Sequence, residues 1–427
     1  MQNFFHRFNR NGLLLSPIPQ QDNNGPEIAP ALDLTRMPYL IVLAVLVSAT
    51  GIMLATGIMW LINVITQLSF FGNPGPGTDI PADTELGKAI LLIPVVGAVV
   101  AIFLQWRNNP LLKVLGLTAI IGTGAPLGEE GPVMLIPGAL AVQMQKQLKI
   151  NAAELNILSI TGIAAGLSWY FGVPVAALCL VLEVLLIQWS FASILPVLAG
   201  VVTGAALHYF FQGTEPAFIL GNGPAVSAKA LLVYTAIGLL IGLFSALIIG
   251  LMKRLNRLFD QLLQQSRWWM LSGAILTGLL ACSTPEILGT GNKYINDLLQ
   301  AHVTLQLLFA LSLMKLLSWM IVTSSAKTGT TVMPLLLIGG ALGLLLAVIF
   351  QVAWPSAIIN PGMAALIGMA AMLAGVSRAL ITTVIFAVET THQPETILPL
   401  ICATVAAYSV SFFLVKKRVD GQLKVEI

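Results

Sequence analysis

Long hydrophobic stretches without a charged side chain alternate with short polar segments along most of this chain. Four of these stretches cover residues 38–66, 89–106, 155–182 and 328–377. A helix needs about 20 apolar residues to cross the hydrocarbon core of a bilayer, so the last stretch must contain more than one helix. Asn360-Pro361-Gly362 marks the expected break, and residues 114–128 are short for a full crossing. These unequal lengths predict tilted and partly broken helices, which are tolerated where their ends face protein or a water-filled cavity.

The composition indicates a membrane protein. Hydrophobic residues make up 57% of the chain and charged residues 9%, whereas soluble domains carry about 25% charged residues. We therefore expect an all-α polytopic membrane protein embedded in a lipid bilayer. The net charge of +3 is small and gives no reason to expect a nucleic-acid partner.

Basic residues gather in three segments, and this distribution predicts the orientation of the chain. They are Arg7, Arg10 and Arg36, then Lys253, Arg254, Arg257 and Arg267, then Lys416, Lys417 and Arg418. The positive-inside rule places all three segments in the cytoplasm, as in a multi-pass protein of the cell membrane with both termini inside. Residues 1–37 lack the apolar core of a signal peptide and are interpreted as a mobile cytoplasmic tail. Residues 416–427 are interpreted as a short second tail, with no regulatory domain.

One charged pair interrupts a run that is otherwise uncharged from Val114 to Gln145. It is Gly128-Glu129-Glu130-Gly131-Pro132. A carboxylate at membrane depth is costly unless it faces a cavity, a partner or a pathway, so the pair indicates a functional site. Pro132 favours the first turn of a helix, which places Glu130 at a helix N-terminus. Such a terminus binds anions through its free N–H groups, and a carboxylate can occupy that place or leave it.

An internal repeat divides the chain into two halves, residues 38–222 and residues 223–415. The landmarks of the first half are Ala165-Gly166-Leu167-Ser168, Glu183 and Ile194-Leu195-Pro196; those of the second are Ala374-Gly375-Val376-Ser377, Glu389 and Ile397-Leu398-Pro399. Repeats in membrane carriers usually place the substrate site at their interface. Extended backward, the repeat aligns residues 329–334 with the Gly-Glu-Glu-Gly-Pro run, so each half offers one helix N-terminus to a dehydrated anion.

Other chemistries have little support in the sequence. The three cysteines fall in apolar runs without metal-ligand spacing and are expected to be free and buried, and the four histidines form no metal motif. No cofactor is expected. Glu129 and Glu130 could serve an intramembrane enzyme as an acid/base pair, but adjacent helical residues point about 100° apart. No nucleophile accompanies them, so we do not expect an enzyme.

The quoted residues resemble the CLC family of chloride channels and proton-coupled anion exchangers. The Gly-Glu-Glu-Gly-Pro run is similar to the family motif G-(K/R)-E-G-P, and Gly329 to Pro334, preceded by Ser324-Ser325, is similar in position to G-x-F-x-P. Pro285 to Gly291 fits the pattern Pro-x3-Gly-x-Gly, and Lys113 and Lys315 stand at positions that are usually basic. The resemblance runs from about Tyr39 to Phe413.

The resemblance implies a homodimer with one pore per subunit, built from inverted repeats of tilted helices, in which Glu130 is the gating residue. The ionised Glu130 would block an anion site, and the protonated side chain would swing away. The residues implied in anion binding are Gly128, Glu129, Gly131, Pro132, Gly329, Thr330, Thr331, Val332 and Met333. Neutral backbone donors of this kind predict weak binding and slight discrimination among anions.

The departures from the family pattern define further expectations. The motif G-S-G-I-P, whose serine coordinates the central anion, is replaced by Arg107-Asn108-Asn109-Pro110, and the central tyrosine has no evident counterpart. Proton-coupled members carry a glutamate directly after the position of Glu183, where this chain has Val184. The inner pore is therefore expected to be wider and less selective, and transport channel-like or only weakly proton-coupled.

The function predicted from the sequence is transmembrane transport of small inorganic anions, with chloride as the default. Two alternatives stay open: a CLC-like carrier for another anion such as fluoride, bicarbonate or an organic anion, and a CLC-fold protein without transport activity. Glu183 and Glu389 each follow an apolar helix and are interpreted as bonding backbone amides rather than relaying protons. Lys315 is interpreted as a structural counter-ion.

Overall fold

The backbone is helical or loop throughout the part of the chain that the computed structural model describes. That part comprises residues 34–106, 109–145, 147, 149–186, 190–221, 227–262, 268–326 and 331–423. Seven helical segments in it are long and apolar enough to cross a membrane, and several apolar helices are shorter. The expected all-α polytopic architecture, with helices of unequal length, is confirmed.

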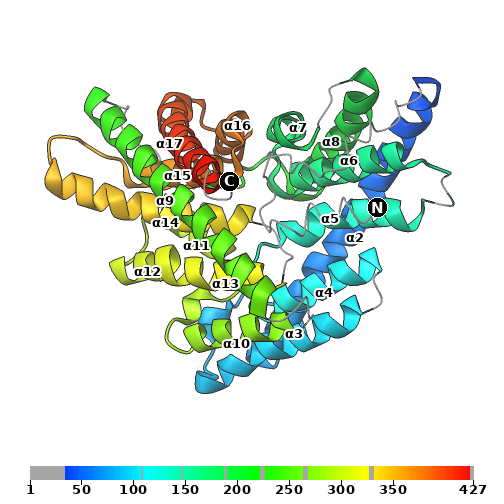
Figure 1. Cartoon of the computed structure of the whole chain (residues 1–427), viewed down its shortest axis with the longest axis horizontal. Coiled ribbons are helices and arrows are strands. Elements are labelled where there is room, and N and C mark those ends of the chain that lie inside the picture. Colours follow the sequence, from blue (N-terminus) through cyan, green and yellow to red (C-terminus); the bar gives the residue numbers. More distant parts are fainter. Residues whose placement is uncertain are drawn as a thin grey trace.

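Seven main helices form the first half of the molecule, which lies on the right in Figure 1. They are α2 (Met37–Phe71), α3 (Leu92–Gln105), α4 (Pro110–Gly122), α5 (Glu130–Gln143), α6 (Ala152–Phe171), α7 (Pro174–Leu180) and α8 (Phe191–Gln212). The side chain of Asn109 accepts a hydrogen bond from the Leu111 N–H and caps α4, and Pro110 occupies the first position of that helix. This combination favours a helix start because Pro lacks the N–H that would otherwise be unpaired.

The second half, on the left in Figure 1, repeats this arrangement with some additions. Its helices are α9 (Ala228–Leu262), α10 (Trp269–Ala281), α11 (Asn292–Leu299), α12 (Leu305–Phe309), α13 (Lys315–Ala326), α14 (Val332–Ala353), α15 (Pro361–Ser377), α16 (Leu380–Thr391) and α17 (Ile397–Leu423). The predicted break at residues 360–362 is confirmed, because Asn360 caps α15 and Pro361 begins it.

Equivalent helices pack in the same way in the two halves. The long helix α2 packs against α5, α6 and α8, and α9, also of 35 residues, packs against α14, α15 and α17. Small residues allow close approach: a methyl group at Gly204 of α8 would meet the Ala165 carbonyl of α6, and one at Gly238 of α9 would meet the Ala403 carbonyl of α17. Close backbone contact through small residues is typical of helices that associate within a bilayer.

The structure qualifies the two predicted tails and the boundary between the halves. Residues 1–33 lie outside the described residues, but residues 34–36 form a short 3₁₀-helix, and Arg36 makes a 3.1 Å ion pair with Glu154. At the other end, α17 continues through the expected start of the tail to Leu423. The boundary at 222/223 falls in a segment that is not described.

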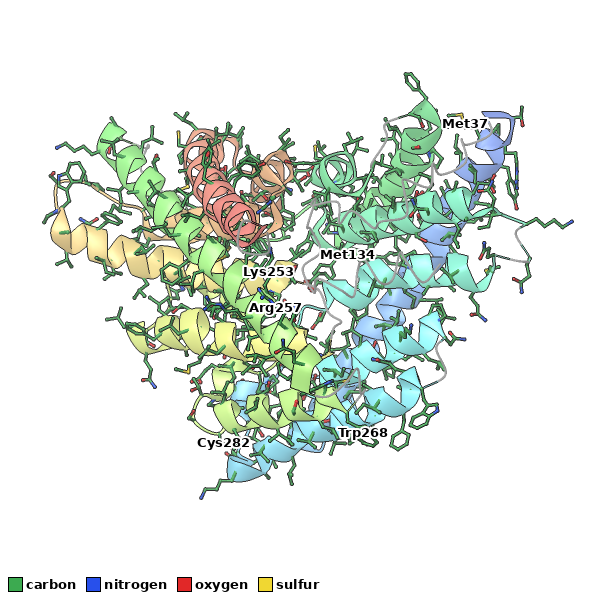
Figure 2. The ribbon with its side chains drawn as sticks, viewed as in Figure 1. Met37, Met134, Lys253, Arg257, Trp268 and Cys282 are labelled. Carbon is green, nitrogen blue, oxygen red and sulfur yellow. The ribbon has the colours of Figure 1, made fainter. Side chains whose placement is uncertain are left out.

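The expectation that all three cysteines are buried is wrong. They are free, but Cys282 is exposed and Cys179 and Cys402 are only partly buried. Cys282 directly follows α10 and lies at the lower edge of the molecule in Figure 2. An apolar run in a membrane protein does not distinguish residues that face the core from residues that face lipid, because both environments favour apolar side chains.

Candidate functional site

The N-terminus of α5 lies inside the protein. The helix begins at Glu130, Pro132 stands in its first turn, and the N–H of Gly131 donates to the Gly128 carbonyl at 3.3 Å. Most of α5 is buried. A helix start that is surrounded by protein needs partners for its free N–H groups, and it favours a nearby negative charge because of the helix dipole.

The carboxylate of Glu130 does not stay at its own helix. The Glu130 side chain has no exposed surface, and its Oε1 accepts a hydrogen bond of 3.0 Å from the backbone N–H of Met333. Met333 is the second residue of α14, after the N-cap residue Thr331 and Val332. The two helices approach each other from opposite halves near the middle of the molecule (Figure 1). Glu130 therefore joins the N-termini of α5 and α14.

Gly128 leaves room for this side-chain position. A Cβ atom at residue 128 would overlap both carboxylate oxygens of Glu130. The carboxylate therefore lies directly against the backbone of the loop before α5. Any larger residue at position 128 would have to push the Glu130 side chain away from Met333.

The N-terminus of α14 is chemically suited to bind an anion. A buried helix N-terminus offers unpaired N–H donors and the positive end of the dipole, which together favour an anion. At α14 the anion is the Glu130 carboxylate itself. A free anion can bind the same N–H group only after that carboxylate has moved.

The residues predicted to bind an anion are only partly brought together. Thr331, Val332 and Met333 are buried at the start of α14, beside the Glu130 carboxylate. Gly329 and Thr330 lie outside the described residues. Gly131 and Pro132 belong to the first turn of α5.

Glu129 has different partners from Glu130. The residue is half-buried, and its carboxylate interacts with the hydroxyl groups of Thr290 and Tyr170. Tyr170 lies near the C-terminal end of α6, and Thr290 lies in the loop before α11. A side chain that is negatively charged and already bonded in this way is poorly suited to bind a second anion.

Glu183 and Glu389 form reciprocal contacts between the two halves. Glu389, near the end of α16, accepts hydrogen bonds from the N–H groups of Val175 and Ala176, at 3.0 and 2.7 Å, in the first turn of α7. Glu183, just beyond the end of α7, accepts hydrogen bonds from three N–H groups and one hydroxyl of α16. The donors are the N–H groups of Leu380 (2.7 Å), Ile381 (3.2 Å) and Thr382 (2.9 Å) and the Thr382 hydroxyl (2.8 Å). Each carboxylate thus caps the helix of the other half, and the predicted bonding to backbone amides is confirmed.

Lys315 is buried without exposed surface. Its Nζ donates to the carbonyls of Ile287, at 3.2 Å, and Gly289, at 2.9 Å. The N–H of Gly289 in turn donates to the Gly124 carbonyl at 2.9 Å. The expectation of a counter-ion is therefore corrected: within the described residues, Lys315 bonds carbonyl oxygens and makes no ion pair with a carboxylate.

Sequence reasoning missed Tyr170 and Thr290, which contact Glu129, and Asn292, which contacts Tyr170. The Nδ2 of Asn292 donates to the Tyr170 hydroxyl at 3.0 Å. The one local signal was that Thr290 stands between two glycines, Gly289 and Gly291, both of which have positive φ angles. Nothing in the sequence connects this loop with Tyr170.

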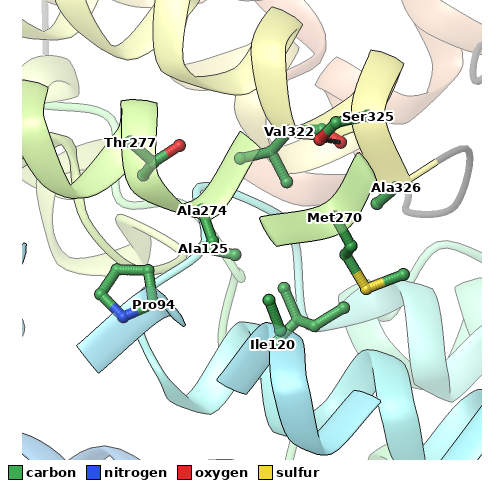
Figure 3. A pocket seen from close by; sticks show the side chains of 10 residues that line it. Pro94, Ile120, Ala125, Met270, Ala274, Thr277, Val322, Ser325 and Ala326 are labelled. Carbon is green, nitrogen blue, oxygen red and sulfur yellow. Dashed lines mark hydrogen bonds between the residues drawn. The ribbon is translucent and has the colours of Figure 1, made fainter. Parts of the chain in front are cut away.

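The described residues offer no metal site, and a small cavity lies apart from Glu130. In the described part of the chain, no group of three or more His, Cys, Asp or Glu residues could hold a metal ion. A cavity of about 10 Å³ lies elsewhere, among α3, α4, α10 and α13, and is lined mostly by apolar side chains such as Ile120 and Met270 (Figure 3). It has room for about one water molecule.

Comparisons of sequence identify relatives along most of the chain. Residues 96–412 match the model of a family described as voltage gated chloride channel. The H(+)/Cl(-) exchange transporter ClcA of Salmonella paratyphi B is 28% identical over 316 residues, which are 72% of this chain and 67% of that protein. The same transporter of Salmonella newport has the same identity and coverage.

Comparisons of structure give the same fold. A slow cyanobacterial Cl-/H+ antiporter superimposes with a TM-score of 0.75 at 19% identity, over 92% of this chain and 99% of that one. A CLC-type fluoride/proton antiporter superimposes with a TM-score of 0.70 at 19% identity, over 89% and 97% of the two chains. The expected CLC-type fold is confirmed.

Proposed function

Because this chain belongs to the voltage-gated chloride channel family, also called CLC, whose members transport anions, we propose that it conducts small inorganic anions through a pathway that Glu130 closes. Chloride is the default substrate. The observation that carries the proposal is the hydrogen bond from the Met333 N–H to the Glu130 carboxylate, at 3.0 Å. The blocking group occupies the position that an anion would take at the N-terminus of α14.

Protonation opens this gate. The ionised carboxylate accepts a charge-assisted hydrogen bond, which is stronger than one between neutral groups. A protonated Glu130 loses that advantage and also loses its attraction to the helix N-terminus. Flux is therefore low when Glu130 is ionised and rises as the pH falls and the residue takes up a proton.

Coupling to protons is weak in the proposed mechanism. The ClcA relatives are named H(+)/Cl(-) exchange transporters, but in this chain the position after Glu183 is Val184, which cannot carry a proton. Glu183 itself is held by the N-terminus of α16. Anion flux is accordingly channel-like, with the proton acting mainly on the gate.

The experiment that tests the function is anion flux from liposomes containing the purified protein. Chloride, fluoride, bicarbonate, nitrate and a small organic anion are compared under identical gradients, with protein-free liposomes as the blank. Flux of chloride supports the proposal. Flux of fluoride or bicarbonate without chloride would favour a carrier for another anion, and absence of all flux would indicate a protein without transport activity.

The proposed assembly is a homodimer in the cell membrane with both termini in the cytoplasm. Large apolar side chains such as Phe191, Phe210, Ile381 and Leu398 are exposed on α8, α16 and α17, more than half of the surface of each being accessible. A second copy or lipid must cover them, since exposed apolar surface of this kind is unfavourable in water. Mass measurement of the protein released gently from a bilayer distinguishes a dimer from a monomer.

A further inference from the structure

The adjacent residues Glu129 and Glu130 point to different surroundings. Glu130 has no exposed surface and bonds Met333 of the second half. Glu129 is half-buried and bonds the hydroxyls of Thr290 and Tyr170. The two carboxylates are still close enough for their charges to interact. The pair therefore consists of one residue without exposed surface and one residue that is partly exposed.

The polar cluster around Glu129 is built from three separate segments. Tyr170 comes from the end of α6, Thr290 from the loop before α11, and Asn292 from the first residue of α11. Asn292 donates to the Tyr170 hydroxyl at 3.0 Å. Tyr170, Thr290 and Asn292 are half-buried, like Glu129. The residues of the cluster are thus partly exposed, whereas Glu130 is not.

The loop that carries Thr290 is firmly held. Lys315 of α13 donates to the carbonyls of Ile287 and Gly289, and the Gly289 N–H donates to the Gly124 carbonyl of the loop before α5. The titratable groups that interact with Glu129 are Glu130, the next residue along the chain, and Tyr170, on α6. From α13, the ammonium of Lys315 is bonded to the carbonyls just before Thr290.

The position of this loop along the chain indicates its side of the membrane. Lys253, Arg254 and Arg257 lie toward the C-terminal end of α9, and α10 then runs away from that side to Ala281. With the basic residues in the cytoplasm, the loop after α10 lies at the outer face. Glu129 is then the carboxylate between Glu130 and the external solution.

We propose that the negative charge of Glu129 sets the external pH at which Glu130 takes up a proton and the gate opens. When both side chains are ionised, the two adjacent charges repel each other, and a proton that binds Glu130 from the external solution removes this repulsion. An ionised Glu129 therefore allows Glu130 to bind a proton at a higher external pH than a neutral neighbour would. Tyr170 and Thr290 hold the ionised Glu129 in place. The inference rests on Glu130 being the gate.

The test is the dependence of anion flux on external pH at fixed internal pH, in liposomes that contain the full-length protein. In Glu129→Gln, the external pH at which flux is half-maximal (the midpoint) is expected to fall by about one unit, which is a tenfold higher proton concentration. The maximal flux at low pH stays near that of the unaltered protein, which also shows that the variant is folded. Glu129→Asp is expected to restore most of the pH response.

The matched control is Glu286→Gln. Glu286 is a carboxylate of the same loop region, in the short 3₁₀-helix Pro285–Ile287, and it is not among the groups that interact with Glu129. Its substitution is expected to leave the midpoint unchanged. An unchanged midpoint in Glu129→Gln, or an equal shift in Glu286→Gln, overturns the inference. If Glu130→Gln changes neither flux nor pH response, the proposed gate itself fails, and that outcome is distinguishable from the other two.

Discussion

The carboxylate of Glu130 accepts a 3.0 Å hydrogen bond from the backbone N–H of Met333, a residue 203 positions later in the sequence. This contact joins the two halves of the chain at the N-termini of α5 and α14. It also means that a negatively charged side chain occupies the place of a permeant anion.

The first prediction concerns this contact directly. Glu130→Gln keeps the size of the side chain but removes its charge, so it should hold the Met333 N–H less strongly. Flux from liposomes should rise several-fold and lose its pH dependence, whereas Glu129→Gln should leave the maximal flux near its original value. Equal effects of the two substitutions on maximal flux would show that the wrong carboxylate has been assigned to the gate.

The second prediction uses the space beside Gly128. A methyl group there would overlap the Glu130 carboxylate oxygens, so Gly128→Ala should displace the carboxylate and raise flux although the carboxylate is intact. Gly57→Ala on α2 is the control, since a Cβ at that position meets nothing within 4 Å. If flux through Gly128→Ala remains as low and as pH-dependent as before, the carboxylate does not block from its observed position.

The third prediction concerns coupling. Chloride flux should drive little proton movement, because Val184 offers no titratable group and Glu183 is bonded to three backbone N–H groups of α16. A pH electrode beside the liposome flux measurement checks this. Proton uptake in a fixed ratio to chloride would refute channel-like transport and indicate another proton path.

The fourth prediction concerns the reciprocal caps. Glu389→Gln should lower the free energy of unfolding by about 1–3 kcal/mol, since the amide keeps only one acceptor oxygen, so that the negative charge and one of the two hydrogen bonds at the start of α7 are lost. Thermal unfolding in detergent measures the change. Glu395→Gln, at an exposed position before α17, is the control and should change stability little. If Glu389→Gln is as stable as the unaltered protein but its proton flux changes, Glu389 does not act as a structural cap of α7.

The fifth prediction concerns affinity. The donors described at the anion site are neutral backbone N–H groups, each worth about 0.5–1.5 kcal/mol net, so chloride should bind with a Kd of about 1 mM or weaker. Chloride, bromide and nitrate should differ only slightly. Calorimetry on Glu130→Gln, in which the site is not occupied by a carboxylate, provides the measurement. Tight and strongly selective chloride binding would be inconsistent with a site made of these donors alone.

Much of this protein was determined by the sequence itself. The uncharged stretches defined the membrane helices, and the Asn360-Pro361 pair marked where one stretch divides into α14 and α15. Glu130 stood out because a carboxylate in a long apolar run is costly. These inferences succeed because helix length, capping and the cost of burying charge depend on residues that are close together in the chain.

The tertiary structure alone decided which groups meet. The sequence matched Glu183 with Glu389, but it did not show that each caps the helix of the other half. It also gave no sign that Tyr170 and Thr290 contact Glu129. Nor did it show that Lys315 binds the carbonyls of Ile287 and Gly289. Hydrogen bonds require donor and acceptor within about 3 Å. Distances of that kind between remote segments depend on how all the helices pack together, which no local pattern records.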